Sequence, residues 1–412
     1  MTWKPGELPQ LDSPESQGLS GERLALIDAY LQGYIDQEKL AGSSFAIMRR
    51  GHLVYYKAFG EASKETNQPM QSDTIHRIYS MSKPITSVAL LTLYEKGKFQ
   101  LDDPIEKYLP EFKDMQVLTG GTPAMPATRH ASASITPRHI MTHTAGLTYG
   151  FEGVPDAVDQ MYRHHKVGDF DDDLTNFSQK ISQLPLRFDP GSSWNYSYGT
   201  DLQGRLIEAL SGMDFESYLQ QNLFDPLGMI DTGFVLPASS VNRFATNYAR
   251  PLGPLVPFEK PDSSPYLEDR SFKSGGGGLV STLPDYLRFG QMLANKGELD
   301  GTRILSRKTV EYATQNHLPD NKDMESMGAG GFSESAFKGV GFCLLGSVCI
   351  NPAAAPNMQS IGDYGWGGAA GTRFWVDPEE DIMCVFMTQF MPGGRYPVQE
   401  YLRHLVLGAI TD

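Results

Sequence analysis

Apolar residues recur every three or four positions between residues 21 and 37, which is the spacing of an amphipathic helix. Two short runs rich in β-forming residues follow at 43–48 and 53–59, with a polar, glycine-containing turn between them. Such a pair of runs predicts a β-hairpin. The beginning of the chain therefore predicts two strands of a sheet and a helix that covers them.

The pattern changes twice further along the chain. Residues 80–290 show mainly helical periodicity, interrupted by loops rich in proline and glycine. Residues 339–350, 371–377 and 382–390 then have the pattern of strands, and residues 397–409 that of a closing helix. Strands at both ends with helices between them predict one sheet, assembled from both ends of the chain and interrupted by a helical insertion.

This order of elements divides the chain into three expected segments. Residues 1–75 and 271–412 supply the two parts of a domain of sheet and helices, and residues 76–270 form a mainly helical domain. Long loops are not predictable from periodicity, and we leave open how three of them fold over a cleft. These loops are residues 113–134, 149–175 and 250–272.

Composition excludes some classes of function. The chain has 412 residues, 40% of them hydrophobic, which allows a large core in one big or two closely packed domains. A formal net charge of -14 repels phosphate backbones and anionic lipid surfaces, so we expect neither a nucleic acid nor a membrane as partner. The sequence shows no secretory signal pattern and no apolar run of membrane-spanning length. Its three cysteines are too few for a disulfide framework, and we expect reduced thiols and a cytoplasmic location.

The most informative segment begins at Ser80. Pro84 is tolerated only in the first turn of a helix and Gly97 is a natural stop, so a helix starts near Ser80 and carries Lys83 on the same face. A serine hydroxyl becomes a nucleophile when a base removes its proton, and an unprotonated lysine amine can be that base. The pattern S-x-x-K alone is weak, because a capping serine followed by a lysine in solvent has the same spacing.

Two further segments can complete such a site. Tyr196 and Tyr198 lie in a turn-rich loop that opens a helix over residues 201–210, and a tyrosine there can relay a proton or simply pack as a half-buried ring. Residues 364–375 predict a glycine-rich turn that runs into a strand. Glycines let the backbone approach a ligand closely, and an amide N–H at the strand edge can stabilise a developing oxyanion.

In order along the chain, these motifs resemble those of the serine β-lactamase and penicillin-recognising superfamily, most closely its class C-like esterase branch, the family VIII carboxylesterases. Ser80 to Lys83 matches S-x-x-K, Tyr196 to Tyr198 stands where the family has Y-x-N or Y-S-x, and Trp366 to Gly368 stands where lactamases have K-T-G and the esterase branch W-G-G. The blocks 135–147 and 275–282 are also family-like. The resemblance spans roughly residues 20–400 and implies the α+β β-lactamase-like fold of class C type, an antiparallel sheet flanked by helices with an all-helical insertion.

The resemblance also implies a role for each matching residue. Ser80 would be the acylated nucleophile and Lys83 its base, while Tyr196 would protonate the leaving alcohol and later activate water. The backbone N–H groups of Ser80 and Ala369 would form the oxyanion hole. The residues expected beside the substrate are Trp366, Gly367, Gly368 and Tyr198.

Two departures from the lactamase motifs suggest the substrate. Tyr198 replaces the asparagine of Y-x-N, and Trp366 replaces the lysine of K-T-G, so an amide and a cation for a substrate carboxylate are both missing. An aromatic wall favours neutral, apolar groups, and we expect hydrolysis of short-chain esters with weak or no β-lactamase activity. A literal K-S-G at Lys273 to Gly275 would restore the cation, and this alternative stays open.

Other functions of the same serine remain open from sequence. An acyl-enzyme can be resolved by water, an alcohol or an amine, so a β-lactamase, an acyltransferase or a D-amino-acid peptidase are alternatives, as is a non-catalytic scaffold. His139 and His143 have the spacing of a helical zinc pair but lack the glutamate of H-E-x-x-H, and we expect no metal and no cofactor. The expected partner is a small-molecule ester, and the sequence does not distinguish a monomer from a homodimer.

Overall fold

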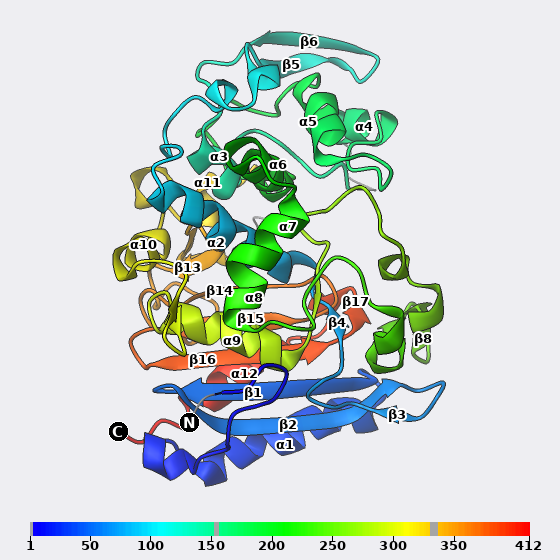
Figure 1. The fold of residues 1–412 in the computed structure, drawn as a ribbon, viewed down its shortest axis with the longest axis vertical. Coiled ribbons are helices and arrows are strands. Elements are labelled where there is room, and N and C mark those ends of the chain that lie inside the picture. The colour runs from blue at the N-terminus through cyan, green and yellow to red at the C-terminus, as the bar shows by residue number, and fades with distance from the viewer. Residues whose placement is uncertain (1–2, 152–155, 330–336) are drawn as a thin grey trace.

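Strands from the two ends of the chain pair in one eight-stranded antiparallel sheet in the computed structural model, which describes residues 3–151, 156–329 and 337–412 (Figure 1). β1 is an interior strand and pairs with β16 from Ser43 opposite Thr388 to Arg49 opposite Ile382. In sheet order the strands are β12 (Val340–Phe342), β13 (Ser347–Cys349), β14 (Tyr364–Gly367), β15 (Arg373–Asp377), β16 (Ile382–Thr388), β1 (Gly42–Arg49), β2 (His52–Ser63) and β3 (Gln68–Pro69).

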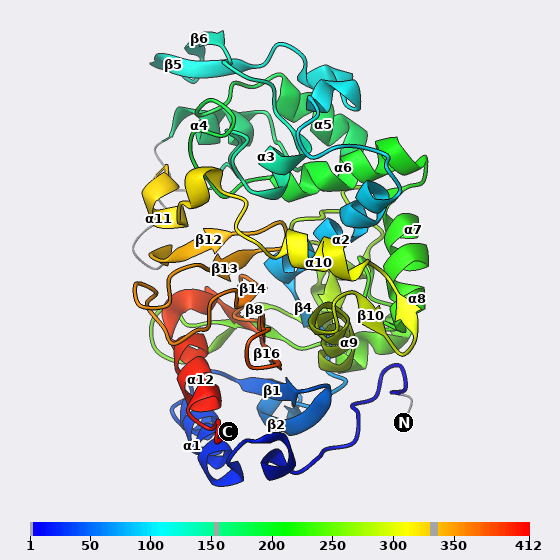
Figure 2. The same ribbon diagram turned by 90° about the vertical axis from the view of Figure 1, so that its left-hand side faces the viewer.

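Helices cover both faces of this sheet. α1 (Gly21–Asp36) begins at Ser20, whose side chain accepts a hydrogen bond from Arg23 N, and buries one apolar face. Figure 2 shows α1 beside α12 (Val398–Leu407), and the two helices form a hydrophobic core with the outer face of the sheet. α9 (Leu283–Ala294) packs on the other face, against β15 and β16.

The remaining helices come from residues 82–327, between β3 and β12 in the chain, and lie in the middle and upper parts of Figure 1. They are α2 (Ser82–Glu95), α3 (Pro137–Met141), α4 (Ala157–His164), α5 (Leu174–Ser182), α6 (Gly199–Ser211), α7 (Phe215–Leu219), α8 (Asp225–Leu227), α10 (Arg307–Ala313) and α11 (Met324–Met327). α2 packs against α6 and connects this part to the sheet through one continuous core.

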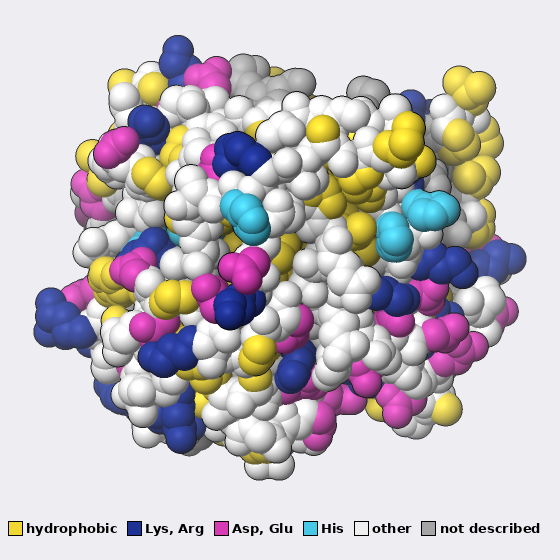
Figure 3. Space-filling view, turned by 90° about the horizontal axis from the view of Figure 1, so that it is seen from above, with side chains coloured by type: hydrophobic (Ala, Val, Ile, Leu, Met, Phe, Trp, Pro, Cys, Tyr) yellow, Lys and Arg dark blue, Asp and Glu magenta, His cyan; other side chains and the backbone are white. Residues whose placement is uncertain are grey.

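Short strands complete the fold. β4 (His76–Arg77) pairs with β9 (Val280–Ser281), β5 (Gln116–Thr122) with β6 (Met125–His130), and β10 (Glu298–Leu299) with β11 (Thr302–Arg303). β7 (Asn247–Ala249) lies between β8 (Val256–Glu259) and β17 (Phe390–Met391). The face seen from above in Figure 3 carries acidic and basic side chains interspersed.

The predicted fold class, an antiparallel sheet flanked by helices with a helical insertion, is confirmed. The boundaries 1–75, 76–270 and 271–412 stay a prediction. Two local predictions were wrong. Residues 339–350 form two short strands, β12 and β13, because the chain turns back near Gly346, and Tyr364–Gly367 is the strand β14 rather than a turn. No helix in the described part of the chain combines the length and the apolar character that crossing a membrane requires.

Candidate active site

Ser80 lies at the beginning of α2, in a tight turn formed by Tyr79–Met81. β4 leads into this turn and is held by β9 through its ladder and by the hydrogen bond from Ile78 N to Leu279 O. Tyr79 has a φ of 42°, in the left-handed region that non-glycine residues rarely adopt. The strained turn therefore sits directly before the serine, where it sets the direction of the serine side chain.

Lys83 lies beneath the serine and is almost completely buried. Its Nζ atom is 3.3 Å from Ser80 Oγ and donates a hydrogen bond of 2.7 Å to the carbonyl oxygen of Gly276. The shared helical face expected for these two side chains is confirmed. A second element holds the amine beside the hydroxyl, because the Gly276 carbonyl comes from the loop before β9.

The loop that supplies this carbonyl is bound tightly to α6. Asp201 is buried and accepts hydrogen bonds from Ser274 Oγ and from Gly276 N, the latter over 3.1 Å. A Cβ atom at Gly276 would lie 2.5 Å from Asp201 Oδ2, so glycine is required for this approach. Burial raises the pKa of the Asp201 carboxyl, and the positive charge of Lys83 opposes that rise.

Tyr196 lies beside Lys83 of α2 and contacts Trp366. The indole Nε1 of Trp366 donates a hydrogen bond to the Tyr196 hydroxyl over 3.1 Å, and Lys83 Nζ is 4.5 Å from the centroid of the Tyr196 ring. The imidazole of His143 packs on the same ring, with centroids 4.8 Å apart. Burial and the neighbouring Lys83 hold the pKa of His143 well below its usual value, so this imidazole is neutral near the lysine.

The other expected substrate residues lie around the same space. Tyr198 presents its ring to the cavity while its hydroxyl donates to Val167 O over 3.1 Å. β14 ends at Gly367, and the next residues turn tightly, with Gly368 N donating to Thr372 O over 2.8 Å. A Cβ atom at Gly368 would lie 2.4 Å from Ile78 O, so the turn packs directly against the serine segment. Ala369 lies in this turn, and its carbonyl oxygen accepts from Gly393 N.

A cavity of about 970 Å³ opens above these groups. The expected residues that line it are Ser80, Tyr196, Tyr198, Trp366, Gly367, Gly368 and Ala369. Aromatic side chains from loops form much of its wall, among them Phe151, Phe170, Phe258, Tyr266 and Phe272. A cavity of this size, lined by aromatic rings with a few polar groups at the base, suits a small organic molecule.

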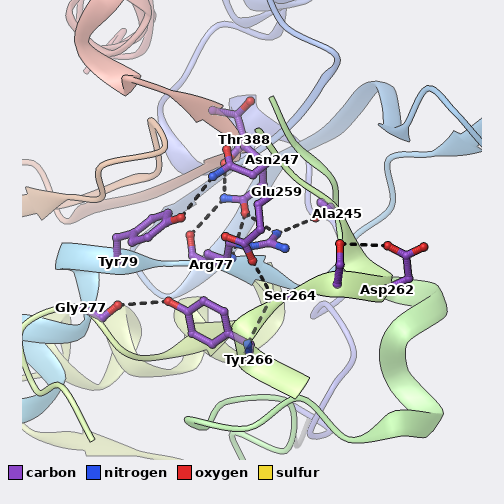
Figure 4. Close-up of polar contacts among 12 residues, drawn as sticks. Arg77, Tyr79, Ala245, Asn247, Glu259, Asp262, Ser264, Tyr266, Gly277 and Thr388 are labelled. Carbon is purple, nitrogen blue, oxygen red and sulfur yellow. Dashed lines mark hydrogen bonds and ion pairs between the residues drawn. The ribbon is translucent and has the colours of Figure 1, made fainter. Parts of the chain in front are cut away.

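One wall of the cavity is bound to the strand that leads to Ser80 by a buried ion pair (Figure 4). Arg77 is completely buried, and its Nε donates to Glu259 Oε1 over 2.7 Å. Its guanidinium also stacks on the ring of Phe244 at 3.8 Å. Next to this pair, Asn247 donates to the Tyr79 hydroxyl and Tyr266 donates to Gly277 O. The cavity wall is thereby bonded to the residues just before Ser80 and to the loop before β9 that supplies the Gly276 carbonyl.

Several of these groups were not identified from sequence. Asp201 has the appearance of an ordinary acidic residue in the first turn of a helix, and the carbonyl of Gly276 has no side-chain signature. His139 Nδ1 accepts a hydrogen bond from Thr136 N in a capping box at the start of α3. Lys273, the alternative cation, has its Nζ 2.9 Å from Glu216 and also paired with Asp269, at the edge of the cavity.

Comparisons with known proteins agree on one family. The family model described as Beta-lactamase matches residues 27–408. Esterase EstB of Burkholderia gladioli is 30% identical over 381 residues, which cover 88% of this chain and 90% of the esterase.

Two solved structures share the fold over nearly the whole chain. EstCE1, described as a hydrolase with promiscuous acyltransferase activity, has a TM-score of 0.79 and 26% identity, and covers 93% of this chain and 98% of its own. Simvastatin synthase LovD of Aspergillus terreus has a TM-score of 0.79 and 25% identity, and the match covers 93% of this chain and 97% of the synthase.

Proposed function

Because this chain belongs to the β-lactamase family, in the branch of the family VIII esterases, we propose that it is a carboxylesterase that hydrolyses short-chain esters through an acyl-enzyme on Ser80. The relatives include an esterase, a hydrolase with acyltransferase activity and a synthase, which together support a serine hydrolase or acyltransferase. The observation that carries the proposal is the distance of 3.3 Å between Lys83 Nζ and Ser80 Oγ at the base of an aromatic cavity.

In the first half of the reaction Lys83 takes the proton of the Ser80 hydroxyl, and Oγ forms a bond to the ester carbonyl carbon. The carbonyl π electrons move to oxygen, and the N–H groups of Ser80 and Ala369 stabilise the resulting oxyanion. When the tetrahedral intermediate collapses, the bond to the alcohol oxygen breaks, and Tyr196 supplies the proton that this oxygen needs. An acyl group then remains on Ser80.

In the second half water resolves the acyl-enzyme. Tyr196 removes a proton from the water, whose oxygen attacks the acyl carbon, and Ser80 leaves with a proton returned from Lys83. The contacts of Tyr196 with Trp366 and Lys83 support this role, because both present positive partial or full charge to the phenol.

Aromatic side chains support a preference for apolar acyl and alcohol groups. Trp366 stands beside Tyr196 in the cavity wall, and Lys273 is engaged by two carboxylates. We therefore propose a small-molecule ester as substrate, with weak or no β-lactamase activity. Acyl transfer to an alcohol is the second candidate, because the structural neighbour EstCE1 is described with that activity.

Rates with 4-nitrophenyl butyrate and the cephalosporin nitrocefin test the proposal. The protein should hydrolyse the butyrate faster, and Ser80→Ala should lower its turnover by about 10³-fold or more. A fluorophosphonate should form a single adduct on Ser80 and none in the Ser80→Ala protein. Faster cleavage of nitrocefin, or full esterase activity in Ser80→Ala, would contradict it. Adding short alcohols and measuring new esters separates transfer from hydrolysis.

A further inference from the structure

A buried carboxylate that the proposed reaction does not use lies behind the site. Asp201 is completely buried in the first turn of α6. It is absent from the described residues that line the cavity, so an ester bound there would not contact it. Any effect of Asp201 on the reaction must therefore pass through another group of the protein.

Asp201 binds the short segment that holds the proposed base. One of its oxygens, Oδ1, accepts hydrogen bonds from Ser274 Oγ and from Gly276 N. The carbonyl oxygen of the same glycine accepts from Lys83 Nζ over 2.7 Å. A single residue, Gly276, thus connects the carboxylate to the amine.

The packing of this segment leaves it little freedom. Thr86 Oγ1 of α2 donates to Gly275 O over 2.9 Å, so the segment lies between α2 and α6. A Cβ atom at Gly275 would lie 2.9 Å from Thr200 O, and one at Gly276 would lie 2.5 Å from Asp201 Oδ2. Contacts this close allow the Gly276 carbonyl only a narrow range of directions.

That direction matters because Lys83 can take the proton of Ser80 only at short range. A lysine head on its flexible stem can turn to several places, and the rings of Tyr149 and Tyr196 lie 5.2 and 4.5 Å from Nζ. Within the described residues, the hydrogen bonds of Nζ are those with Ser80 Oγ and Gly276 O. The Gly276 carbonyl is therefore the fixed acceptor that keeps the amine beside the hydroxyl.

We propose that Asp201 is a positioning residue of the reaction, because through Gly276 it keeps the amine of Lys83 within reach of the nucleophile. This rests on the proposed function, in which Lys83 is the base for Ser80, and adds to it a residue that does not touch the ester. Loss of the Asp201 contacts should slow attack by the serine without weakening binding in the cavity.

Labelling of Ser80 by a fluorophosphonate separates these two effects. The rate at saturating probe measures attack by the serine, and the probe concentration at half that rate measures binding. Asp201→Ala removes the acceptor and should lower the saturating rate on the order of 10- to 100-fold, as expected for lost hydrogen bonds to a carboxylate. The half-saturating concentration should stay within about twofold of the wild-type value.

Two smaller changes provide a test even if Asp201→Ala does not fold. Asp201→Asn retains an oxygen that can accept the same two hydrogen bonds, so its saturating rate should stay within about fivefold of the wild-type rate. Ser274→Ala removes one of the two donors and should lower the saturating rate about 3- to 10-fold. An unchanged rate in Ser274→Ala and in Asp201→Ala would overturn the proposal.

Asp285→Ala is the matched control. Asp285 is also buried in the first turn of a helix, α9, and through one oxygen it accepts from Thr232 Oγ1 and from Asp231 N. It is not among the described residues that line the cavity. Its loss should lower stability and leave the saturating rate within about twofold. An equal fall in both alanine variants would mean that general destabilisation causes the effect, which contradicts a positioning role.

A double variant tests whether Asp201 acts through Lys83. Lys83→Met removes the amine and should itself slow the labelling. Adding Asp201→Ala should then slow it no further, since two changes that act on one group are not additive. A further fall on the order of tenfold would show that Asp201 acts by another route.

Crystal structures of the wild-type and Asp201→Ala proteins decide the geometry whether or not Ser80 reacts. In the variant the distance from Lys83 Nζ to Ser80 Oγ should exceed about 4 Å, beyond hydrogen-bonding range. Unchanged distances from Nζ to Ser80 Oγ and to Gly276 O would overturn the proposal. Absence of labelling in the wild type would instead contradict the proposed function, while these distances still test the role of Asp201.

Discussion

The indole N–H of Trp366 donates a hydrogen bond to the hydroxyl oxygen of Tyr196, and this joins a strand of the sheet to the loop that opens α6. The residue that replaces the lysine of K-T-G thus contacts the proposed proton-transfer group directly. Trp366 is therefore more than an apolar wall. Its N–H stabilises negative charge on the phenolic oxygen, which is the charge that develops when Tyr196 gives its proton to the leaving alcohol.

Trp366→Phe keeps an aromatic ring and removes this donor. We expect kcat for 4-nitrophenyl butyrate to fall about 3- to 10-fold, the effect of losing one hydrogen bond of roughly 1 kcal/mol. Trp375→Phe is the control, because that indole is buried against the α1 and α12 side and its Nε1 has no partner in the described structure. An unchanged kcat in Trp366→Phe would contradict the role.

The alternative K-S-G assignment is tested by two separate alanine variants. Lys273 is held by Glu216 and Asp269, whereas Trp366 contacts Tyr196. Trp366→Ala should therefore lower kcat/KM for the butyrate about 10- to 100-fold, since both ring contact and donor are lost. Lys273→Ala should lower kcat/KM for the same ester less than Trp366→Ala does. The reverse order, measured under the same conditions, would favour Lys273 as the residue of the site.

The Arg77–Glu259 ion pair should be important for stability. Glu259→Ala leaves the guanidinium of Arg77 buried without its carboxylate, and this should lower the free energy of unfolding by about 3 kcal/mol. Urea denaturation measures the change. Glu268→Ala breaks the surface pair with Arg270 and should change stability by less than about 1 kcal/mol. If the two variants lowered the free energy of unfolding equally, the buried pair would contribute no more to stability than the surface pair.

Buried His76 should make folding sensitive to acid. Burial lowers its pKa to about 3, so the folded protein leaves the imidazole neutral while the unfolded chain takes up a proton below about pH 6.5. Stability from this group is therefore present above pH 6.5 and is lost as the pH falls toward 3. The slope is about 1.4 kcal/mol per pH unit for one group.

His76→Gln removes this titration. Between pH 6.5 and 4.5 the free energy of unfolding of the variant should fall less steeply than that of the wild type, measured by urea denaturation at each pH. Other titrating groups, such as His139 and His143, are present in both proteins and cancel in the comparison. Parallel curves would mean that His76 takes up its proton in the folded protein as readily as in the unfolded chain, and would contradict the prediction.

Local patterns predicted the parts of the fold that depend on neighbouring residues. The spacing of apolar positions identified α1, β1, β2, β15 and β16, since helical and strand periods are properties of short segments. The same local rule placed the side chain of Ser80, in the turn before α2, beside that of Lys83, in the first turn of α2. It failed at residues 339–350 and 364–367, where apolar and glycine content do not show whether the chain continues or turns.

The sequence by itself determined the helix that begins at the S-x-x-K motif, because residues close together in the chain set it, and it determined the order of the motifs, because that order is the order of the chain. Only the tertiary structure decided that the Gly276 carbonyl holds Lys83, that Trp366 bonds to Tyr196 and that Asp201 binds Gly276 N. The physical reason is that contacts between distant residues depend on how whole elements pack and on which buried polar groups find partners.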